Sequence, residues 1–205
     1  MITDRMMKEI DRTADDVRAR VTVSDSNENM NEIDEGLYSR QLYVMGREAQ
    51  QRMSGAQVLL VGMNGLGAEV AKNVILAGVK AVTIVDDTLT SIEDLSSQFY
   101  LTAQDVGHAR AQACASKLSE LNQYVALNVH TGEVTESLIE SFSVVVVNGL
   151  NWADAERING WCRAHKVCFI MANVVGVFAN VFCDFGEAFV VTDKDGERPS
   201  DCMIA

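Results

Sequence analysis

The segment from residue 57 to residue 87 constrains the fold most, because it reads as a strand, a glycine turn, a helix and a second strand. "QVLLVG" (57–62) is a short continuous apolar run, which is typical of a strand buried on both faces of a sheet. "LGAEVAKNVILAGV" (66–79) has apolar residues at helical spacing, and "AVTIVDD" (81–87) is rich in β-branched residues. This order predicts parallel strands joined by a helix that packs on their sheet.

Strand and helix patterns keep alternating along the rest of the chain. We expect helices over 36–55, 135–142 and 151–166, a further helix within 102–122, and strands over 124–132, 143–149 and 167–176. The apolar runs 177–185 and 187–193 predict two last strands that form a hairpin through Gly186. The expected fold class is α/β: a doubly wound, mainly parallel sheet with helices on both faces and an antiparallel extension near the C-terminus.

Residues 1–35 differ from the remainder of the chain. They are polar, acidic and poor in apolar residues, so we expect a flexible acidic leader before a domain that occupies residues 36–205. The chain of 205 residues carries a net charge of −12, which disfavours general binding of nucleic acid. It contains no apolar stretch long enough to span a bilayer and no secretory signal, so we expect a cytoplasmic and nuclear location without membrane attachment.

The residue types that often carry chemistry show no catalytic or metal-binding spacing. Five cysteines without a CxxC pair indicate reduced thiols, with Cys183 in the core and Cys202 as the candidate for a reactive surface thiol. The three histidines are isolated, and we expect them at the surface or at helix ends, with no metal bound: His108, His130 and His165. Trp152 and Trp161 are interpreted as packing residues.

The turn "GMNGLG" (62–67) nearly matches the G-x-G-x-x-G pattern that binds dinucleotides between a strand and a helix. Gly62 and Gly67 fit the outer positions, whereas Asn64 holds the middle one and Gly65 follows it. The Asn64 side chain occupies space that a phosphate needs, although the helix N-terminus still attracts anions. Asp86, at the end of the next strand, stands where an acid bonds a ribose hydroxyl. These residues leave open whether the turn binds a nucleotide or only shapes the fold.

Four segments resemble the family of ubiquitin-activating enzymes and their bacterial adenylyltransferase relatives. They are "LYSRQLYVMG" (37–46), "VLLVGMNGLGAEVAKNVILAGVKAVTIVDD" (58–87), "DLSSQFYL" (94–101) and "VFCDFGEAFVVTD" (181–193). The resemblance covers about residues 36–205 and implies a Rossmann-like, ThiF/MoeB-like domain. It is closer to the single-chain ubiquitin-activating enzyme than to the separate small subunits of SUMO or NEDD8 activators.

In that family two adenylation-type halves pair, and only one of them binds ATP and Mg²⁺. An active half typically carries "DLNRQF", whose Asn and Arg contact the nucleotide phosphates. Ser96 and Ser97 stand at those positions here, followed by Gln98, and serine supplies no cation to a triphosphate. The resemblance therefore implies an inactive half with no cofactor of its own. Its degenerate site would comprise Gly62, Asn64, Gly65, Gly67, Asp86, Ser96, Ser97 and Gln98.

The resemblance also implies a role for Arg40, in the segment "YSRQ". In the family this arginine reaches the ATP phosphates that the other half holds. The expected partners are that active half and, through the full enzyme, ubiquitin and ubiquitin-conjugating enzymes; the chain by itself would be inactive and could self-associate. The family's catalytic cysteine lies downstream, and "VVTDKDGERPSDCMIA" (190–205) resembles the point where its first half-domain is inserted.

Three alternatives remain open from the sequence. The chain could be a regulatory subunit of a SUMO- or NEDD8-type activating heterodimer. It could be an NAD-dependent oxidoreductase that uses "GMNGLG" and Asp86. It could also be a non-catalytic Rossmann-like scaffold that has left ubiquitin chemistry.

Overall fold

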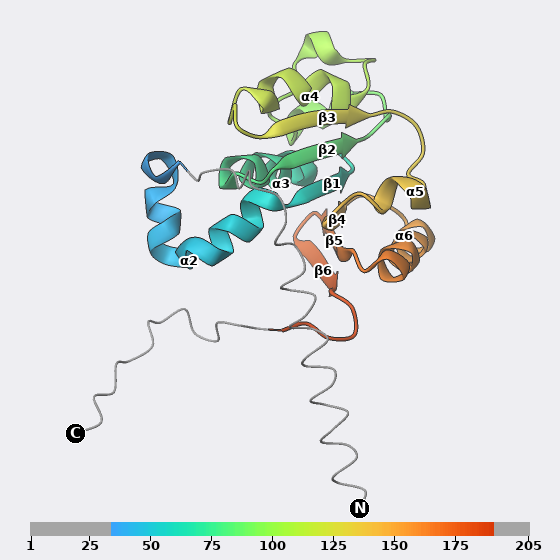
Figure 1. Ribbon diagram of the computed structural model, residues 1–205. Coiled ribbons are helices and arrows are strands. Elements are labelled where there is room, and N and C mark those ends of the chain that lie inside the picture. The colour runs from blue at the N-terminus through green and yellow to red at the C-terminus, as the bar shows by residue number, and fades with distance from the viewer. Residues whose placement is uncertain (1–33, 191–205) are drawn as a thin grey trace, which may run out of the picture. The chain divides into compact units, whose positions relative to one another are not determined.

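The computed structural model describes residues 34–190, and contacts divide the chain into two units, residues 1–39 and 40–205. The second unit contains one six-stranded sheet, in the order β3-β2-β1-β4-β5-β6 (Figure 1). The strands are β1 (Gln57–Val61), β2 (Ala81–Val85), β3 (Ala126–His130), β4 (Val144–Val147), β5 (Cys168–Val175) and β6 (Phe178–Asp184). The first five strands run parallel, and β6 pairs antiparallel with β5.

The order of the strands reverses direction at β1. The chain moves outward from β1 through β2 to β3, and then crosses to the other side of β1 for β4 and β5. Ligands of doubly wound sheets bind in the crevice at the carboxyl ends of the strands where this reversal occurs. In this fold that point lies between β1 and β4.

Helices cover both faces of the sheet, as expected (Figure 1). On one face, α3 (Gly65–Ala77) and α4 (Arg110–Ser119) pack on alternate strand residues such as Leu60 and Ile84. On the other face, α5 (Glu136–Ile139) and α6 (Trp152–His165) pack on their neighbours Leu59 and Val145. The continuous apolar strands arise because both of their faces are buried.

The predicted hairpin through Gly186 is wrong. The hairpin instead joins β5 to β6 across Gly176 and Val177, and Gly176 has the left-handed backbone (φ 61°) that a tight turn requires. Asp184 ends β6, because its side chain accepts a hydrogen bond of 3.0 Å from the Gly186 N–H and so forms a turn. Residues 187–190 are not a strand, and 191–193 lie outside the described residues.

Two expected helices are present, with features that the sequence did not predict. The helix expected within 102–122 is α4, which begins only at Arg110, because a short 3₁₀-helix η2 (Ala103–Asp105), closed by reciprocal bonds between Thr102 and Asp105, precedes it. The left-handed Gly107 (φ 88°) separates the two. The first described helix, α2 (Glu35–Gly55), is interrupted at Gly46, whose backbone is not helical (φ 80°, ψ 167°).

The cysteines divide by burial. Cys114 and Cys162 are buried, which raises the pKa of each thiol to about 12. Cys183 is exposed, so its expected place in the core is wrong: β6 is the edge strand, and every residue of it except Asp184 is exposed. Cys202 and most of the leader lie outside the described residues.

The tryptophans and histidines are only partly as expected. Trp161 packs on the second core, whereas the Trp152 side chain is 65% exposed and therefore does not serve as an internal packing residue. His108 is exposed, and His130 and His165 are half-buried. Residues 34–190 contain no group of three metal-ligating side chains, and no helix among them is long and apolar enough to cross a membrane.

Candidate functional site

The glycine turn between β1 and α3 is held by close backbone packing. A Cβ on Gly67 would lie 2.0 Å from the carbonyl oxygen of Gly62. A Cβ on Gly62, which has a φ of 94°, would lie 2.3 Å from the carbonyl oxygen of Asn148. Both outer glycines of the motif are therefore required by the fold, whether or not a nucleotide binds.

Asn64 occupies the start of α3 with its own side chain. Its Oδ1 accepts a hydrogen bond of 3.0 Å from the N–H of Gly67, so it is the N-cap of the helix. Its Nδ2 lies so near Gly149 that a Cβ there would approach it to 3.0 Å. The amide thus takes one of the N–H groups that a helix N-terminus otherwise offers to a phosphate.

Asp86 lies at the end of β2 and is buried, so it is not a solvent-exposed strand-end acid. Its Oδ2 accepts a hydrogen bond of 2.7 Å from the Met63 N–H, and its Oδ1 accepts one of 2.9 Å from the Thr88 N–H. The Nε of Arg110 lies 3.0 Å from Oδ2. Both oxygens that would meet a ribose hydroxyl are already engaged by the protein.

Arg110 was not found from the sequence, since no motif marks its pairing with an acid 24 residues earlier. It begins α4 and joins two acids, because its Nη1 also donates a 2.9 Å hydrogen bond to Oδ1 of Asp94. Burial alone would raise the pKa of Asp94, but the Ser91 N–H and Arg110 outweigh it and hold that pKa below its usual value. The guanidinium is therefore compensated within the chain.

Residues 96–98 are brought against the turn by η1 (Glu93–Ser96) and the segment after it. The Ser96 hydroxyl donates to the Glu93 carbonyl (2.7 Å), and the Ser97 carbonyl would lie 2.9 Å from a Cβ on Gly65. Gln98 is fully buried; its Nε2 donates to the Met63 carbonyl (3.3 Å), and its Oε1 accepts from the Tyr100 N–H (2.9 Å). The segment thus closes over the start of α3, and Gln98 fastens it to the turn.

Asn148 is a second residue that sequence reasoning missed. It directly follows β4 and is 2% exposed. Its Nδ2 donates to the carbonyl oxygens of Val61 (3.1 Å) and Gly62 (2.7 Å), which joins the carboxyl ends of β1 and β4. An asparagine directly after an apolar strand was the available signal, but this position alone does not distinguish a strand clamp from a ligand contact.

A crevice of about 520 Å³ opens at this edge of the sheet. Its lining includes the backbone of Gly62 and three carboxylates, on Asp86, Asp87 and Glu133. Among the described residues that line it, Arg110 is the one cation, and it is already paired with Asp86. The charge of the crevice is therefore unfavourable for a polyphosphate.

Arg40 lies outside this crevice. It is exposed on α2, and within residues 34–190 it makes no hydrogen bond or ion pair. The structure thus brings together the residues of the predicted degenerate site, although Ser96 and Ser97 are exposed and do not line the crevice. Arg40 does not line the crevice either.

Comparison with known proteins identifies the family. The model of the ThiF family matches residues 38–189. Ubiquitin-activating enzyme E1 1 of Schizosaccharomyces pombe is 49% identical over 86% of this chain and 17% of its own length. Ubiquitin-like modifier-activating enzyme 1 of Homo sapiens is 45% identical over 85% of the chain and 16% of its own length. The chain therefore spans about one sixth of the length of these relatives.

A solved structure has the same fold. A crystal structure of Escherichia coli MccB superposes with a TM-score of 0.63 at 18% identity, over 76% of this chain and 48% of that one. This likeness agrees with the doubly wound sheet and its antiparallel β5–β6 extension. From the family match, the identity to ubiquitin-activating enzymes and the shared fold, we conclude that the chain belongs to the ThiF family and is related to ubiquitin-activating enzymes.

Proposed function

We propose that this chain is the leading part of the adenylation half that holds no nucleotide in a ubiquitin-activating enzyme. In such an enzyme the other half binds ATP and Mg²⁺ and adenylates the carboxyl end of ubiquitin, before a cysteine captures the acyl group as a thioester. The observation that carries the proposal is Asp86, whose two carboxylate oxygens bind Met63, Thr88 and Arg110 instead of a ribose.

The rest of the crevice supports the same role. A triphosphate requires cations and free N–H donors. Here Asn64 uses the Gly67 N–H, and two carboxylates of the lining, on Asp87 and Glu133, form no ion pair within the described residues. Asp87 Oδ2 also accepts a hydrogen bond of 2.6 Å from the Gly132 N–H. The residues present do not fit ATP, so we assign the chain an architectural role in this half.

Calorimetry with Mg·ATP on the 205-residue chain tests this assignment. We expect no saturable heat up to about 1 mM ATP, the upper end of typical enzyme substrate affinities. Saturable binding in the micromolar range would contradict the assignment directly. NAD in the same experiment tests the oxidoreductase alternative, for which binding of NAD is required.

We further propose that Arg40 contacts the nucleotide held by the other half. The side chain is exposed on α2 and unpaired within the described residues, so its charge is available to a partner. A guanidinium supplied across an interface stabilises the charge that develops on transferring phosphates. This contact would be the chain's direct contribution to adenylate formation.

In the complete enzyme, we expect Arg40→Ala to slow ATP–pyrophosphate exchange by on the order of 10³-fold, the effect of a trans-acting arginine elsewhere. The control is Arg52→Ala, an exposed arginine of the same helix that pairs with Glu48. Both variants should keep the unfolding temperature of the parent enzyme. An exchange rate that Arg40→Ala leaves unchanged would exclude the proposed contact.

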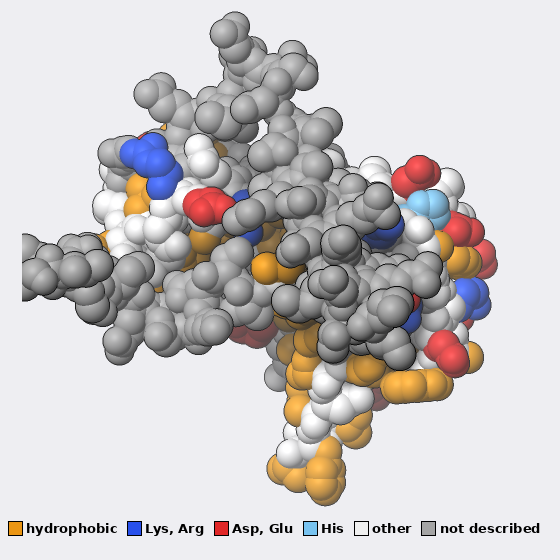
Figure 2. Space-filling model, turned by 60° about the horizontal axis from the view of Figure 1, so that its bottom comes forward, with side chains coloured by type: hydrophobic (Ala, Val, Ile, Leu, Met, Phe, Trp, Pro, Cys, Tyr) orange, Lys and Arg blue, Asp and Glu red, His pale blue; other side chains and the backbone are white. Residues whose placement is uncertain are grey.

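The β5–β6 hairpin supports pairing with a second half. Its apolar side chains are strongly exposed, and Figure 2 shows hydrophobic side chains gathered on a projection of the molecule. The exposed set is Val174, Val175, Val177, Phe178, Val181 and Phe182. Contiguous exposed apolar surface of this kind marks an interface in soluble proteins. We therefore assign the tip of this hairpin, residues 174–178, to the contact between the two halves.

A further inference from the structure

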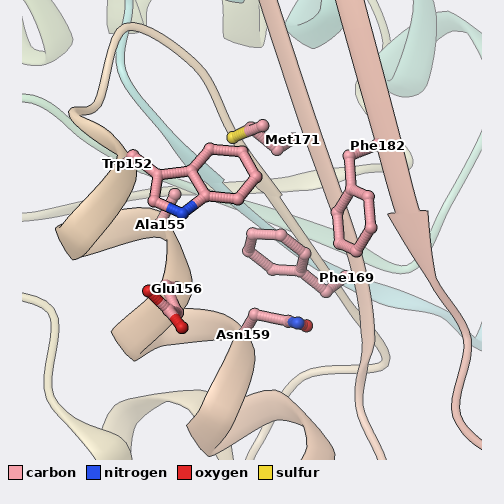
Figure 3. Close-up of a pocket in the computed structure, with 7 residues that line it drawn as sticks. All are labelled: Trp152, Ala155, Glu156, Asn159, Phe169, Met171 and Phe182. Carbon is pink, nitrogen blue, oxygen red and sulfur yellow. The ribbon is translucent and has the colours of Figure 1, made fainter.

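A second, smaller pocket lies between α6 and the last two strands, on the opposite face of the sheet from α3 and α4 (Figure 3). We call it the aromatic slot, and it is formed mainly by Trp152, Glu156, Asn159, Phe169, Met171 and Phe182. Phe169 is buried (1% exposed) and forms the floor. Trp152 and Phe182, which are 65% and 43% exposed, stand on opposite sides of it.

The walls of the slot are held in place by polar contacts between α6 and β6. Asp184 of β6 accepts a hydrogen bond of 3.1 Å from Asn159 and forms an ion pair of 2.8 Å with Arg163, both from α6. Asn151 caps the helix directly before Trp152, because its Oδ1 accepts a 2.9 Å bond from the Asp154 N–H. The slot is therefore preformed, and little ordering is needed to fill it.

The size of the slot suits one side chain. Its volume of about 230 Å³ is below the range of about 300–1,000 Å³ that is usual for small-molecule sites. A dry cavity of about 150 Å³ accommodates benzene, so an aromatic or branched apolar side chain has room here. Binding energy at protein interfaces is concentrated in such anchor side chains, which fill desolvated pockets of the partner.

The charge at the rim of the aromatic slot indicates which kind of partner it can bind. Glu156 lies at the rim, is exposed, and has no ion pair or hydrogen bond within the described range. The other acids nearby are compensated: Asp154 pairs with Arg157, and Asp184 pairs with Arg163. A second copy of the chain would bring another charge of −12 against this rim, which disfavours it as the occupant.

We propose that the aromatic slot binds an apolar side chain, flanked by lysine or arginine, on a segment of a different polypeptide. The anchor packs on Phe169 between Trp152 and Phe182, and the flanking cation pairs with Glu156. This inference is independent of the nucleotide chemistry proposed above, since none of these residues lines the crevice.

The two tryptophans allow a test with an internal reference. The chain is labelled with 5-fluorotryptophan, and the two ¹⁹F signals are assigned with a Trp152→Phe variant. Trp161 lies under Arg157, 5.5 Å from the guanidinium to the ring centroid, and does not line the slot. The probes are nine-residue peptides with a central phenylalanine or alanine, flanked on both sides by lysines or by glutamates.

We expect the lysine-flanked phenylalanine peptide to shift the Trp152 signal saturably and to leave the Trp161 signal in place. The central alanine should weaken binding by roughly 10-fold or more, which corresponds to the burial of one large apolar side chain. Glutamate flanks should also weaken binding, and Glu156→Lys should reverse the preference between the two flanks.

Several results would overturn the proposal. They are equal responses to the phenylalanine and alanine peptides, a common shift of both tryptophan signals, and an unchanged flank preference in Glu156→Lys. A Trp152 shift that depends on the concentration of the chain alone would make a second copy the occupant, which also contradicts it. None of these outcomes depends on Arg40, so the peptide experiment and the test of the proposed function can fail independently of each other.

Discussion

Arg110 neutralises Asp86 inside the crevice: its Nε lies 3.0 Å from Oδ2, and the two side chains are 17% and 5% exposed. The Nε–H makes no hydrogen bond in spite of this distance, whereas Nη2 reaches Oδ1 at 3.5 Å. The contact is thus mainly an ion pair. It satisfies the acid that a nucleotide-binding half of this fold would offer to a ribose.

Arg110→Met should therefore destabilise the fold strongly. The change leaves Asp86 and Asp94 without their shared cation, and breaking a buried pair from one side costs about 3–5 kcal/mol of unfolding free energy. The measurement is urea unfolding followed by circular dichroism. Arg157→Met, which removes an exposed pair with Asp154, is the matched control and should cost about 0–1 kcal/mol. Equal losses of unfolding free energy in the two variants would show that the buried pair stabilises the fold no more than an exposed pair does.

Gly67→Ala tests whether the turn is structural. The added Cβ would meet the Gly62 carbonyl oxygen at 2.0 Å, so we expect a loss of about 1–3 kcal/mol, as for overpacking in a core, despite the better helix propensity of alanine. Gly160→Ala in α6 is the control, since a Cβ there meets nothing within 4 Å. That variant should gain about 0.4–1 kcal/mol in unfolding free energy. A neutral Gly67→Ala would indicate that the turn can open.

Sequence patterning predicted the sheet well because its strands are buried on both faces. The runs around Leu59 and Val145 are continuous and apolar, and each is followed by a helix. Sequence patterning did not predict the ends of elements that local polar hydrogen bonds determine. The reciprocal hydrogen bonds between Thr102 and Asp105 form η2, so that α4 begins only at Arg110. The turn that the Asp184 side chain forms with the Gly186 N–H ends β6.

The site was predictable only where a motif fixes spacing. Gly62, Gly67 and Asp86 follow from the strand–turn–helix–strand pattern. Arg110 and Asn148 do not, because their partners are 24 and 86 or 87 residues away in sequence and meet only through the parallel sheet. Both residues bind groups of the chain that line the crevice: Arg110 pairs with Asp86, and Asn148 donates to the carbonyl oxygens of Val61 and Gly62.

The stability of the chain should fall in acid partly through Asp94. The pKa of this carboxyl is lowered in the fold, since the Ser91 N–H and Arg110 outweigh its burial. The unfolded chain then binds a proton more readily, so the stabilisation is complete above an unfolded pKa of about 3.9 and is lost as the pH falls through the lower folded pKa. Asp94→Asn should therefore flatten the decline of unfolding free energy below about pH 4. Glu93→Gln, an exposed neighbour in η1, controls for the loss of a carboxylate, and an unchanged decline in Asp94→Asn would contradict the assignment.

Thiol modification should separate the cysteines by burial. In a Cys202→Ser chain at pH 8, the exposed Cys183 should react first with a disulfide reagent, because the thiolate is the reactive form. Burial raises the pKa of Cys114 and Cys162 to about 12, so these thiols should react only after unfolding in urea. Mass spectrometry of the modified peptides identifies the site. Fast modification of Cys114 in the native chain would show that α4 opens readily.

Restoring the glycine pattern should not restore nucleotide binding. Asn64→Gly produces G-x-G-x-x-G and frees the Gly67 N–H, but the oxygens of Asp86 remain bound to Met63, Thr88 and Arg110. We expect the variant to lose a few tenths of a kcal/mol in unfolding free energy, as glycine replaces an asparagine cap, and to give no saturable heat with Mg·ATP. Asn64→Ala, which also removes the cap but adds no glycine, should be less stable by about 0.5–2 kcal/mol and equally silent. Micromolar binding of ATP by Asn64→Gly, but not by Asn64→Ala, would contradict this prediction. It would mean that the Asn64 side chain alone prevents binding, and that a ribose can displace Arg110 from Asp86.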